Sequence, residues 1–283
     1  MTKKRAVKHD DLIYDVGMHQ GEDTNFYLRK GFRVIAFEAD PDLVNNCRTR
    51  FSEELASGQL TIAEGAIVDD VSQPTITFYK NDTVTVWGTI DPKWKERNAR
   101  MGWDSKAIEV NVVDFAACLE TYGIPHYLKI DIEGADLVCL ERLLDFDVAP
   151  DYISIESDKL SLDAIENEID LLDQLGFDSF KLMQQATITD QRLPKPTHEG
   201  KDIDYQIPHG SSGLFGQDLP GKWRSRAAVM HSYGRIMLSY RVFGNDSFMR
   251  KNPVAREAWK LLQRITGRPI PGWYDTHARH SSV

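Results

Sequence analysis

The first residues whose types and spacing could bind a ligand lie at the end of a short apolar segment, residues 12–16. Asp15, Gly17 and Gly21 belong to the run Asp-Val-Gly-Met-His-Gln-Gly. Glycines let the backbone approach a ligand closely, but this spacing differs from the Gly-x-Gly-x-x-Gly loop that holds a pyrophosphate. An acidic Asp15 would repel phosphates and would suit a ligand with an ammonium and a sulfonium. The run favours a nucleoside cofactor without a diphosphate, although Asp15 and Gly17 alone also fit an ordinary turn.

A second candidate, Glu38, ends the next apolar segment, residues 33–37, and is followed by Ala39, Asp40 and Pro41. The carboxyl ends of parallel strands line one crevice, which is where ligands bind in open α/β sheets. A carboxylate at this place can accept charge-assisted hydrogen bonds from both hydroxyls of a ribose. Glu38 therefore strengthens the prediction of a nucleoside cofactor.

A third acidic group follows the apolar segment 127–132, which reads Tyr-Leu-Lys-Ile-Asp-Ile and continues with Glu-Gly. Asp131 and Glu133 would lie at the same edge of the sheet, beside the reactive end of the cofactor. The alternative is a helix start, with Asp131 as the N-cap and Glu133 in the first turn. The position at a strand end favours the functional interpretation for Asp131.

The elements that position these groups alternate between strand and helix, which is typical of right-handed βαβ units. We therefore predict an α/β fold with a doubly wound, mostly parallel sheet. Segments flanking the turn residues 80–82 predict an inserted β-hairpin over residues 73–89. The other expected strands are 12–16, 33–37, 60–68, 108–112, 127–132, 152–155 and 179–183, and the expected helices are 23–30, 41–57, 92–100, 113–122, 135–144, 162–175, 225–243 and 253–265.

Three regions are expected along the chain. Residues 1–186 hold the α/β series and the cofactor site. Residues 187–221 are rich in proline and glycine and predict a linker or a substrate-facing cover. Residues 222–283 predict a basic helical C-terminal extension, and His277 and His280 at its end fit a solvated tail better than a metal pair.

Taken together, the three motifs resemble the FkbM family of methyltransferases in order and spacing, over residues 12–183. The resemblance implies a class I, Rossmann-like methyltransferase fold and S-adenosylmethionine as the methyl donor. It also implies a hydroxyl acceptor on a sugar, a glycoconjugate or a natural product. One departure concerns the first loop, where the family usually has Asp-Val-Gly-Ala-Asn and this chain has Met18 and His19 in the last two places.

The resemblance extends to contacts with both substrates. Trp87 and Trp94 could stack on a sugar face and Ser211 and Ser212 could bond its hydroxyls, although Trp87 could equally fill the core and the serines could simply turn the chain. The expected acceptor contacts are Trp87, Thr89, Trp94, Ser211 and Ser212. The expected cofactor contacts are Asp15, Gly17, Met18, His19, Gly21, Thr24, Glu38, Ala39, Ala66, Asp131 and Glu133.

An alcohol is a poor nucleophile until its proton is removed, and a positioned base typically contributes about 100 to 10,000-fold. The candidates are Asp131 and, at the end of the next strand, Glu156 and Asp158. A magnesium ion held by these three carboxylates is an alternative that the pattern does not favour. His126 precedes its strand and is expected at the wrong end of the sheet.

Composition limits the other partners. The net charge is −9, yet residues 217–283 carry 12 Lys and Arg against 4 Asp and Glu. No apolar run approaches the roughly 18 residues of a membrane span, so we expect a cytoplasmic protein, and a homo-oligomer is compatible with the sequence. The three cysteines, Cys47, Cys118 and Cys139, show no spacing of a disulfide framework or zinc site.

Three other functions are less well supported. A nicotinamide-dependent oxidoreductase would need the missing Gly-x-Gly-x-x-Gly loop. A nucleic-acid methyltransferase is disfavoured by the acidic net charge and by the lack of an Asn/Asp-Pro-Pro-aromatic motif after residues 127–132. A non-catalytic cofactor-binding module is suggested only by Met18 and His19.

Overall fold

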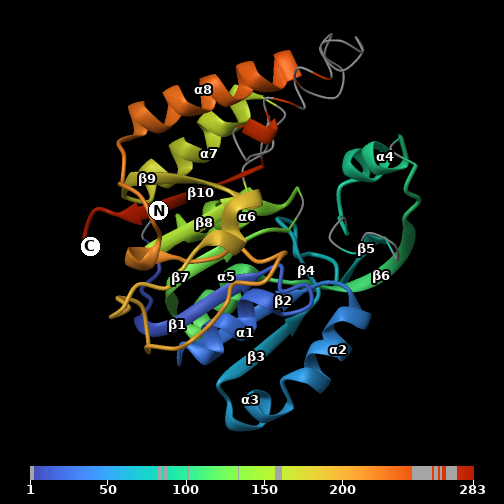
Figure 1. The fold of residues 1–283 in the computed structure, drawn as a ribbon. Helices are drawn as coiled ribbons and strands as arrows, with labels where there is room; N and C mark the ends of the chain where they lie inside the picture. Colours follow the sequence, from blue (N-terminus) through green and yellow to red (C-terminus); the bar gives the residue numbers. More distant parts are fainter. Residues whose placement is uncertain are drawn as a thin grey trace.

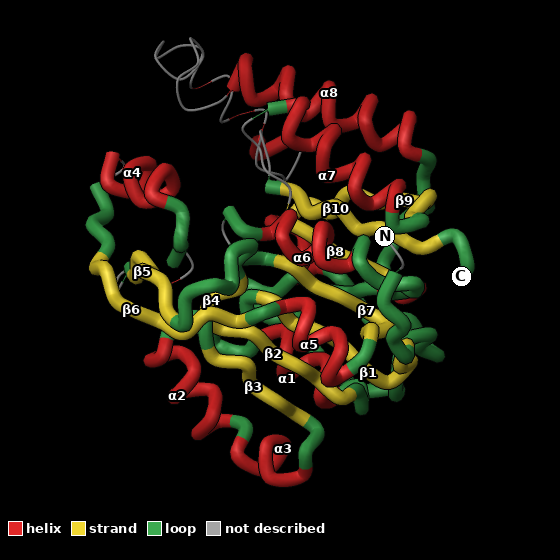
Figure 2. Tube along the Cα trace, turned by 180° about the vertical axis from the view of Figure 1, so that it is seen from behind, coloured by secondary structure: helices red, strands yellow, loops and turns green. Residues whose placement is uncertain are grey.

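The computed structural model describes residues 3–81, 85, 88–100, 102–132, 134–156, 161–243, 257, 261, 263–265 and 273–283. A seven-stranded sheet lies between two covering layers, and a three-stranded sheet with helix α4 projects from it (Figure 1, Figure 2). The described elements are β1 Lys8–Val16, α1 Glu22–Arg29, β2 Arg33–Glu38, α2 Pro41–Arg50, α3 Ser52–Ser57, β3 Leu60–Glu64, β4 Ala66–Ile67, β5 Thr75–Lys80, α4 Pro92–Arg100, β6 Lys106–Val113, α5 Phe115–Tyr122, β7 Ile124–Ile130, α6 Asp136–Leu143, β8 Tyr152–Glu156, α7 Leu162–Gln174, β9 Phe177–Gln184, the 3₁₀ helices η2 Gln185–Asp190 and η3 Gly216–Asp218, α8 Arg226–Phe243 and β10 Tyr274–His280.

The main sheet has the strand order β3-β2-β1-β7-β8-β10-β9. Strands β3, β2, β1, β7 and β8 are parallel, so their carboxyl ends meet at one edge. The prediction of a doubly wound, mostly parallel sheet is confirmed. The strands β1 and β7 at its centre place the motifs that follow them side by side.

Alternating side chains of the strands build a core on each face, as the period of two demands. From β1, Leu12 and Tyr14 pack on the side of α5 to α8, whereas Ile13 packs on the side of α1 and α2. The loop-like segment 187–221 completes this second layer, because Phe215 is buried and stacks on Tyr127 of β7 with ring centroids 4.4 Å apart. The segment is therefore part of the core covering.

The expected solvated tail at residues 277–280 is wrong. Strand β10 lies between β8 and β9 and pairs antiparallel with both. Thr276 and His277 are buried, and Thr276 Oγ1 lies 2.5 Å from the hydroxyl of Tyr233 on α8. Ala278 is the only aliphatic residue of this strand, so hydrophobic alternation could not reveal it. The description of 222–283 as a helical extension thus omits a strand of the main sheet.

The expected hairpin over residues 73–89 is described only in part. Strand β5 pairs along its length with β6, antiparallel, and Tyr79 also forms an antiparallel bridge with Thr89. Residues 82–84, 86 and 87 lie outside the described residues. The expected strand 60–68 divides at Gly65 (φ +140°) into β3 in the main sheet and β4 beside β6. Helix 41–57 likewise divides at Phe51 into α2 and α3.

Toward the C-terminus, α8 matches the expected helix 225–243. The expected helix 253–265 lies mostly outside the described residues. No helix in the described part of the chain is both long and apolar enough to cross a membrane.

His126 lies near the amino end of β7, at the edge of the sheet opposite to the ends of the motif strands, as expected. Its Nδ1 is 2.8 Å from Asp151 Oδ2 and its Nε2 is 2.8 Å from Glu199 Oε2. Burial alone would lower the pKa of His126, but the hydrogen bonds to these two carboxylates outweigh it and raise the pKa to about 9. The charged imidazole thus ties the segment 187–221 to the sheet.

The raised pKa of His126 predicts that the protein loses stability at alkaline pH. Because the folded pKa is raised above the unfolded value of about 6.5, the contribution is fully present below pH 6.5 and is lost as the pH rises through 9. His126→Gln should therefore lower the free energy of unfolding by up to about 3 kcal/mol at pH 6 and by much less at pH 10. Urea denaturation at both pH values measures this difference. The same change at exposed His231 should leave the pH dependence unaltered, and an equal loss at both pH values would contradict a charged His126.

Candidate functional site

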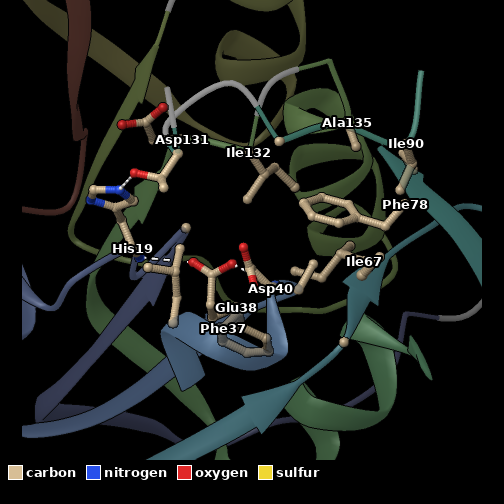
Figure 3. A pocket seen from close by; sticks show the side chains of 17 residues that line it. His19, Phe37, Glu38, Asp40, Ile67, Phe78, Ile90, Asp131, Ile132 and Ala135 are labelled. Carbon is tan, nitrogen blue, oxygen red and sulfur yellow. Dashed lines mark hydrogen bonds between the residues drawn. The ribbon is translucent and has the colours of Figure 1, made fainter. Parts of the chain in front are cut away.

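A half-open cavity lies at the carboxyl ends of β1, β2 and β7, and the small sheet closes one side of it (Figure 3). Its empty space is about 750 Å³, part of which is open to solvent. The lining residues are Gly17, His19, Phe37, Glu38, Ala39, Asp40, Leu43, Gly65, Ala66, Ile67, Phe78, Thr85, Gly88, Ile90, Asp131, Ile132 and Ala135.

Gly17 brings the first loop against the end of β7. Its φ is +86°, and a Cβ at this position would lie 1.9 Å from the carbonyl oxygen of Asp131. The backbone N–H groups of Gly17 and Met18 both donate to the carbonyl oxygen of Phe37, over 3.1 and 2.9 Å. Only a glycine fits this close approach of three chain segments.

Glu38 joins the first loop to the second. Its Oε2 accepts a hydrogen bond of 2.8 Å from the backbone N–H of His19, and its Oε1 accepts one of 2.8 Å from that of Asp40. Burial raises the pKa of Glu38 above its usual value, against the effect of these two donors. Each carboxylate oxygen has two lone pairs, so both oxygens can accept a further hydrogen bond from a ligand.

The cavity is apolar at one end and polar at the other, with Glu38 between them (Figure 3). Ile67, Phe78 and Ile90 gather at the apolar end, to which Ala39 and Ala66 add their methyl groups. His19 and Asp131 lie at the polar end (Figure 3). A ligand with a flat apolar group, a diol and a charged tail matches this order.

Asp131 follows β7, and its side chain is 43% exposed. The loop after it is held by Asp136, whose two carboxylate oxygens accept hydrogen bonds from the backbone N–H groups of Ile132 (3.0 Å) and Gly134 (3.1 Å). Burial raises the pKa of Asp136 to about 6. Asp131 does not cap α6, because the N-cap position is Ala135 and no side chain makes a cap hydrogen bond there. Glu133 lies outside the described residues.

The Methyltransferase FkbM domain matches residues 15–179, more than half of the chain. This chain belongs to the FkbM methyltransferase family. The match begins at Asp15 in the first loop and includes β2, β7 and β8, so it contains all three motifs. The fold is thus that of a class I methyltransferase, and family membership implies S-adenosylmethionine as the methyl donor.

The individual proteins that resemble this chain match it at low identity or over a short stretch. Probable ribosomal RNA small subunit methyltransferase A of Methanospirillum hungatei JF-1 is 35% identical over 57 residues, 20% of this chain and 22% of that protein. The solved Methyltransferase FkbM from Methylobacillus flagellatus KT is 16% identical over 63% of this chain and 41% of its own, with a TM-score of 0.39. Precorrin-6y C5,15-methyltransferase from Geobacter metallireducens GS-15 is 12% identical over 63% and 69%, with a TM-score of 0.36. Our chain thus spans less than half the length of the first two proteins.

Several expected cofactor contacts of the FkbM domain lie beneath the cavity. Asp15 is fully buried, where its Oδ2 accepts a hydrogen bond of 2.6 Å from Thr24 and its Oδ1 pairs with Lys129 over 3.1 Å. Met18 packs in the core, and Gly21 precedes α1 against the ring of Phe51. The structure therefore gives Asp15 and Thr24 a supporting place, whereas Gly17, His19, Glu38, Ala39, Ala66 and Asp131 line the cavity.

The expected acceptor contacts divide in the same way. Ser211 and Ser212 are buried behind α1, where the backbone N–H of Ser212 donates to both carboxylate oxygens of Asp23. This placement agrees with serines that shape the chain. Thr89 is buried beside the cavity, and Trp94 of α4 lies against Gly134, where a Cβ would meet its ring at 2.9 Å. Trp87 lies outside the described residues.

The expected acidic group at the end of β8 is described only in part. Glu156 ends β8 and does not line the cavity, and Asp158 lies outside the described residues. Within the described ranges, no three His, Cys, Asp or Glu side chains are arranged to hold a metal ion. Of the two described candidates, Asp131 lines the cavity and Glu156 does not.

The sequence reasoning missed the apolar wall of the FkbM domain. Phe78 and Ile90 belong to the small sheet region, and Ile132 and Ala135 flank the loop after β7. Phe78 is held by the pairing of β5 with β6, and Ile90 follows Thr89, which forms an isolated bridge with Tyr79. For Ile132 the signal was present, because it lies inside the third motif.

Proposed function

We propose that this protein transfers a methyl group from S-adenosylmethionine to a hydroxyl on a sugar, a glycoconjugate or a natural product. The observation that carries the proposal is Glu38, whose carboxylate lies between the apolar and the polar end of the cavity at the carboxyl edge of the sheet. The two ribose hydroxyls of the donor would donate to the Glu38 oxygens. This assignment fixes the direction of the donor in the cavity.

With the ribose at Glu38, the remaining parts of the donor match the two ends. Ala39, Ala66 and Phe78 offer an apolar wall for the adenine ring. At the other end, Gly17 allows close backbone approach and Asp131 supplies a negative charge near the sulfonium. When bound, S-adenosylmethionine supplies a methyl carbon that is electrophilic because it is bonded to positively charged sulfur.

The acceptor would enter at the polar end. Asp131 is accessible there, and Trp94 lies beside the same loop through its contact with Gly134. A carboxylate can accept the hydrogen bond of an acceptor hydroxyl and orient it, and an aromatic ring can cover a sugar face. Holding an oxygen at near-attack distance from the methyl group can itself supply much of the rate.

Calorimetry tests the donor site directly. We expect S-adenosylmethionine and S-adenosylhomocysteine to bind, and Glu38→Ala to weaken both by about 10 to 100-fold, because charge-assisted hydrogen bonds to the ribose contribute about 1.5 kcal/mol or more each. The control is Glu109→Ala, which removes an exposed carboxylate of β6. Tight binding of NADH without binding of the methyl donor would overturn the proposal.

A further inference from the structure

His19 has a backbone conformation that its residue type rarely adopts. Its φ is +52°, in the left-handed region, and no other non-glycine residue in the described part of the chain has a positive φ. Such a conformation is uncommon for a residue with a side chain and persists where the surroundings hold it. Here the backbone N–H donates to Glu38 and the backbone carbonyl oxygen accepts from the thiol of Cys47 at 3.5 Å.

The left-handed turn directs the imidazole into the cavity, where it lies between a carboxylate and a hydroxyl. Nδ1 is 3.6 Å from Glu22 Oε2, and Nε2 is 2.8 Å from the Thr85 hydroxyl. Figure 3 shows the ring at the polar end, on the same side as Asp131. Burial alone would raise the pKa of Glu22, but the nearby imidazole of His19, the backbone at the start of α1 and the charge of Lys129 outweigh it and lower the pKa, so Glu22 is a carboxylate.

This order of groups suits one tautomer. A proton on Nδ1 would face the Glu22 carboxylate, and in that tautomer the lone pair on Nε2 can accept a hydrogen bond from a hydroxyl. Carboxylate, imidazole and hydroxyl in this order form the arrangement by which a histidine removes a proton from an alcohol. In this structure the Thr85 hydroxyl occupies the position next to Nε2.

We propose that His19 is the general base of the reaction, with Glu22 as its positioning residue and with the Thr85 hydroxyl marking the place that the acceptor hydroxyl takes. This inference rests on the proposed function. In the transfer step the acceptor oxygen forms a bond to the methyl carbon, and the carbon–sulfur bond breaks with its electron pair remaining on sulfur. The acceptor proton moves to Nε2 of His19, and the imidazolium then releases a proton to solvent.

The charges around His19 suit this role. Glu22 on α1, Glu38 at the end of β2 and Asp131 at the end of β7 are the acidic groups near it, and the Cys47 thiol faces its carbonyl oxygen. The buried cation Lys129 is held by Asp15, by the carbonyl oxygen of Gly17 and, at 4.0 Å, by Asp131. The three carboxylates stabilise the positive charge that the imidazole gains during the transfer. Asp131 then orients the acceptor and does not need to take its proton.

His19→Asn tests the proposal with little risk to the fold, because asparagine tolerates a positive φ and the backbone bonds remain. Methyl transfer from labelled S-adenosylmethionine to a panel of methyl glycosides is followed from pH 5 to 9. We expect kcat/KM to fall by about 100-fold or more and the acidic limb of the wild-type pH profile to disappear. Affinity for S-adenosylhomocysteine, measured by calorimetry, should change by less than about threefold. Glu22→Gln should give a smaller loss, and Asp131→Asn should lower turnover while the acidic limb remains. The control is His231→Asn on α8, with an unchanged rate and profile.

Calorimetry separates the two proposals, since a wild type that fails to bind S-adenosylhomocysteine rejects the proposed function itself. If the donor binds, three results overturn the role of His19. One is normal turnover of His19→Asn with its acidic limb retained. Another is a loss of S-adenosylhomocysteine affinity that accounts for the whole loss of rate, which would make His19 a donor-binding residue. The third is a wild type that binds the donor and methylates none of the glycosides.

Discussion

A chain that ends at Gly272 is expected to lose its cooperative fold and with it all binding of S-adenosylhomocysteine. The reason is the position of β10, which pairs with β8 on one side and with β9 on the other. Without β10, the backbone N–H and C=O groups of β8 and β9 that face it lose their partners. Ala278 and Thr276 also no longer fill the core. Unpaired backbone groups in a buried sheet are costly.

Circular dichroism and thermal melting measure the outcome of this truncation. We expect retained helical signal without a sharp transition, together with binding of a hydrophobic dye, as in compact states that lack fixed packing. A chain that ends at His280 keeps β10 and should melt like the full chain. If the chain that ends at Gly272 melted cooperatively and bound S-adenosylhomocysteine normally, β10 would be dispensable and the last region would be a separate extension.

The difference between the predicted and the observed C-terminal region has a physical cause. The strands β1, β2 and β7 are rich in apolar residues and each is followed by a motif, so their existence and order could be predicted. Strand β10 reads Tyr-Asp-Thr-His-Ala-Arg-His, and its burial depends on bonds made far away in the sequence, such as that of Thr276 with Tyr233. A strand whose polar residues bond to buried partners lacks the alternation of apolar and polar residues that predicts a strand.

The candidate site was predictable to the level of the strand end. The sequence placed Gly17, Glu38 and Asp131 at one edge of the sheet, and all three line the cavity. It could not decide which side of each strand end faces the ligand. Asp15 belongs to β1 and shares the face of Ile13, two residues before it, so its side chain points toward α1, where Thr24 donates to it. The position of Ser211 depends on the hydrogen bonds between Ser212 and Asp23 of α1, which lie far apart in the sequence.

A buried charge network of Lys129 and its neighbouring carboxylates lies beneath the cavity. Lys129 is almost fully buried, and its Nζ donates to the carbonyl oxygen of Gly17 over 2.6 Å and pairs with Asp15 over 3.1 Å. Burial alone would lower the pKa of Lys129, but the nearby carboxylates of Asp15, Asp131 and Asp23 outweigh it and raise the pKa. Lys129 thus stays charged and neutralises Asp15.

Lys129→Met should therefore lower the free energy of unfolding by about 3 to 5 kcal/mol, the usual cost of leaving a buried charge without its partner. Asp15→Asn in the same chain should restore more than half of this loss, since the amide oxygen can still accept from Thr24 and the charge that pairs with Lys129 over 3.1 Å is removed. Urea denaturation of the two single variants and the double variant gives the coupling energy. The matched control is Lys4→Met, which breaks the exposed pair with Glu120 and should cost less than about 1 kcal/mol. If the double variant were no more stable than Lys129→Met alone, the loss would come from the bond to Gly17, and the role of Asp15 as the partner charge would be rejected.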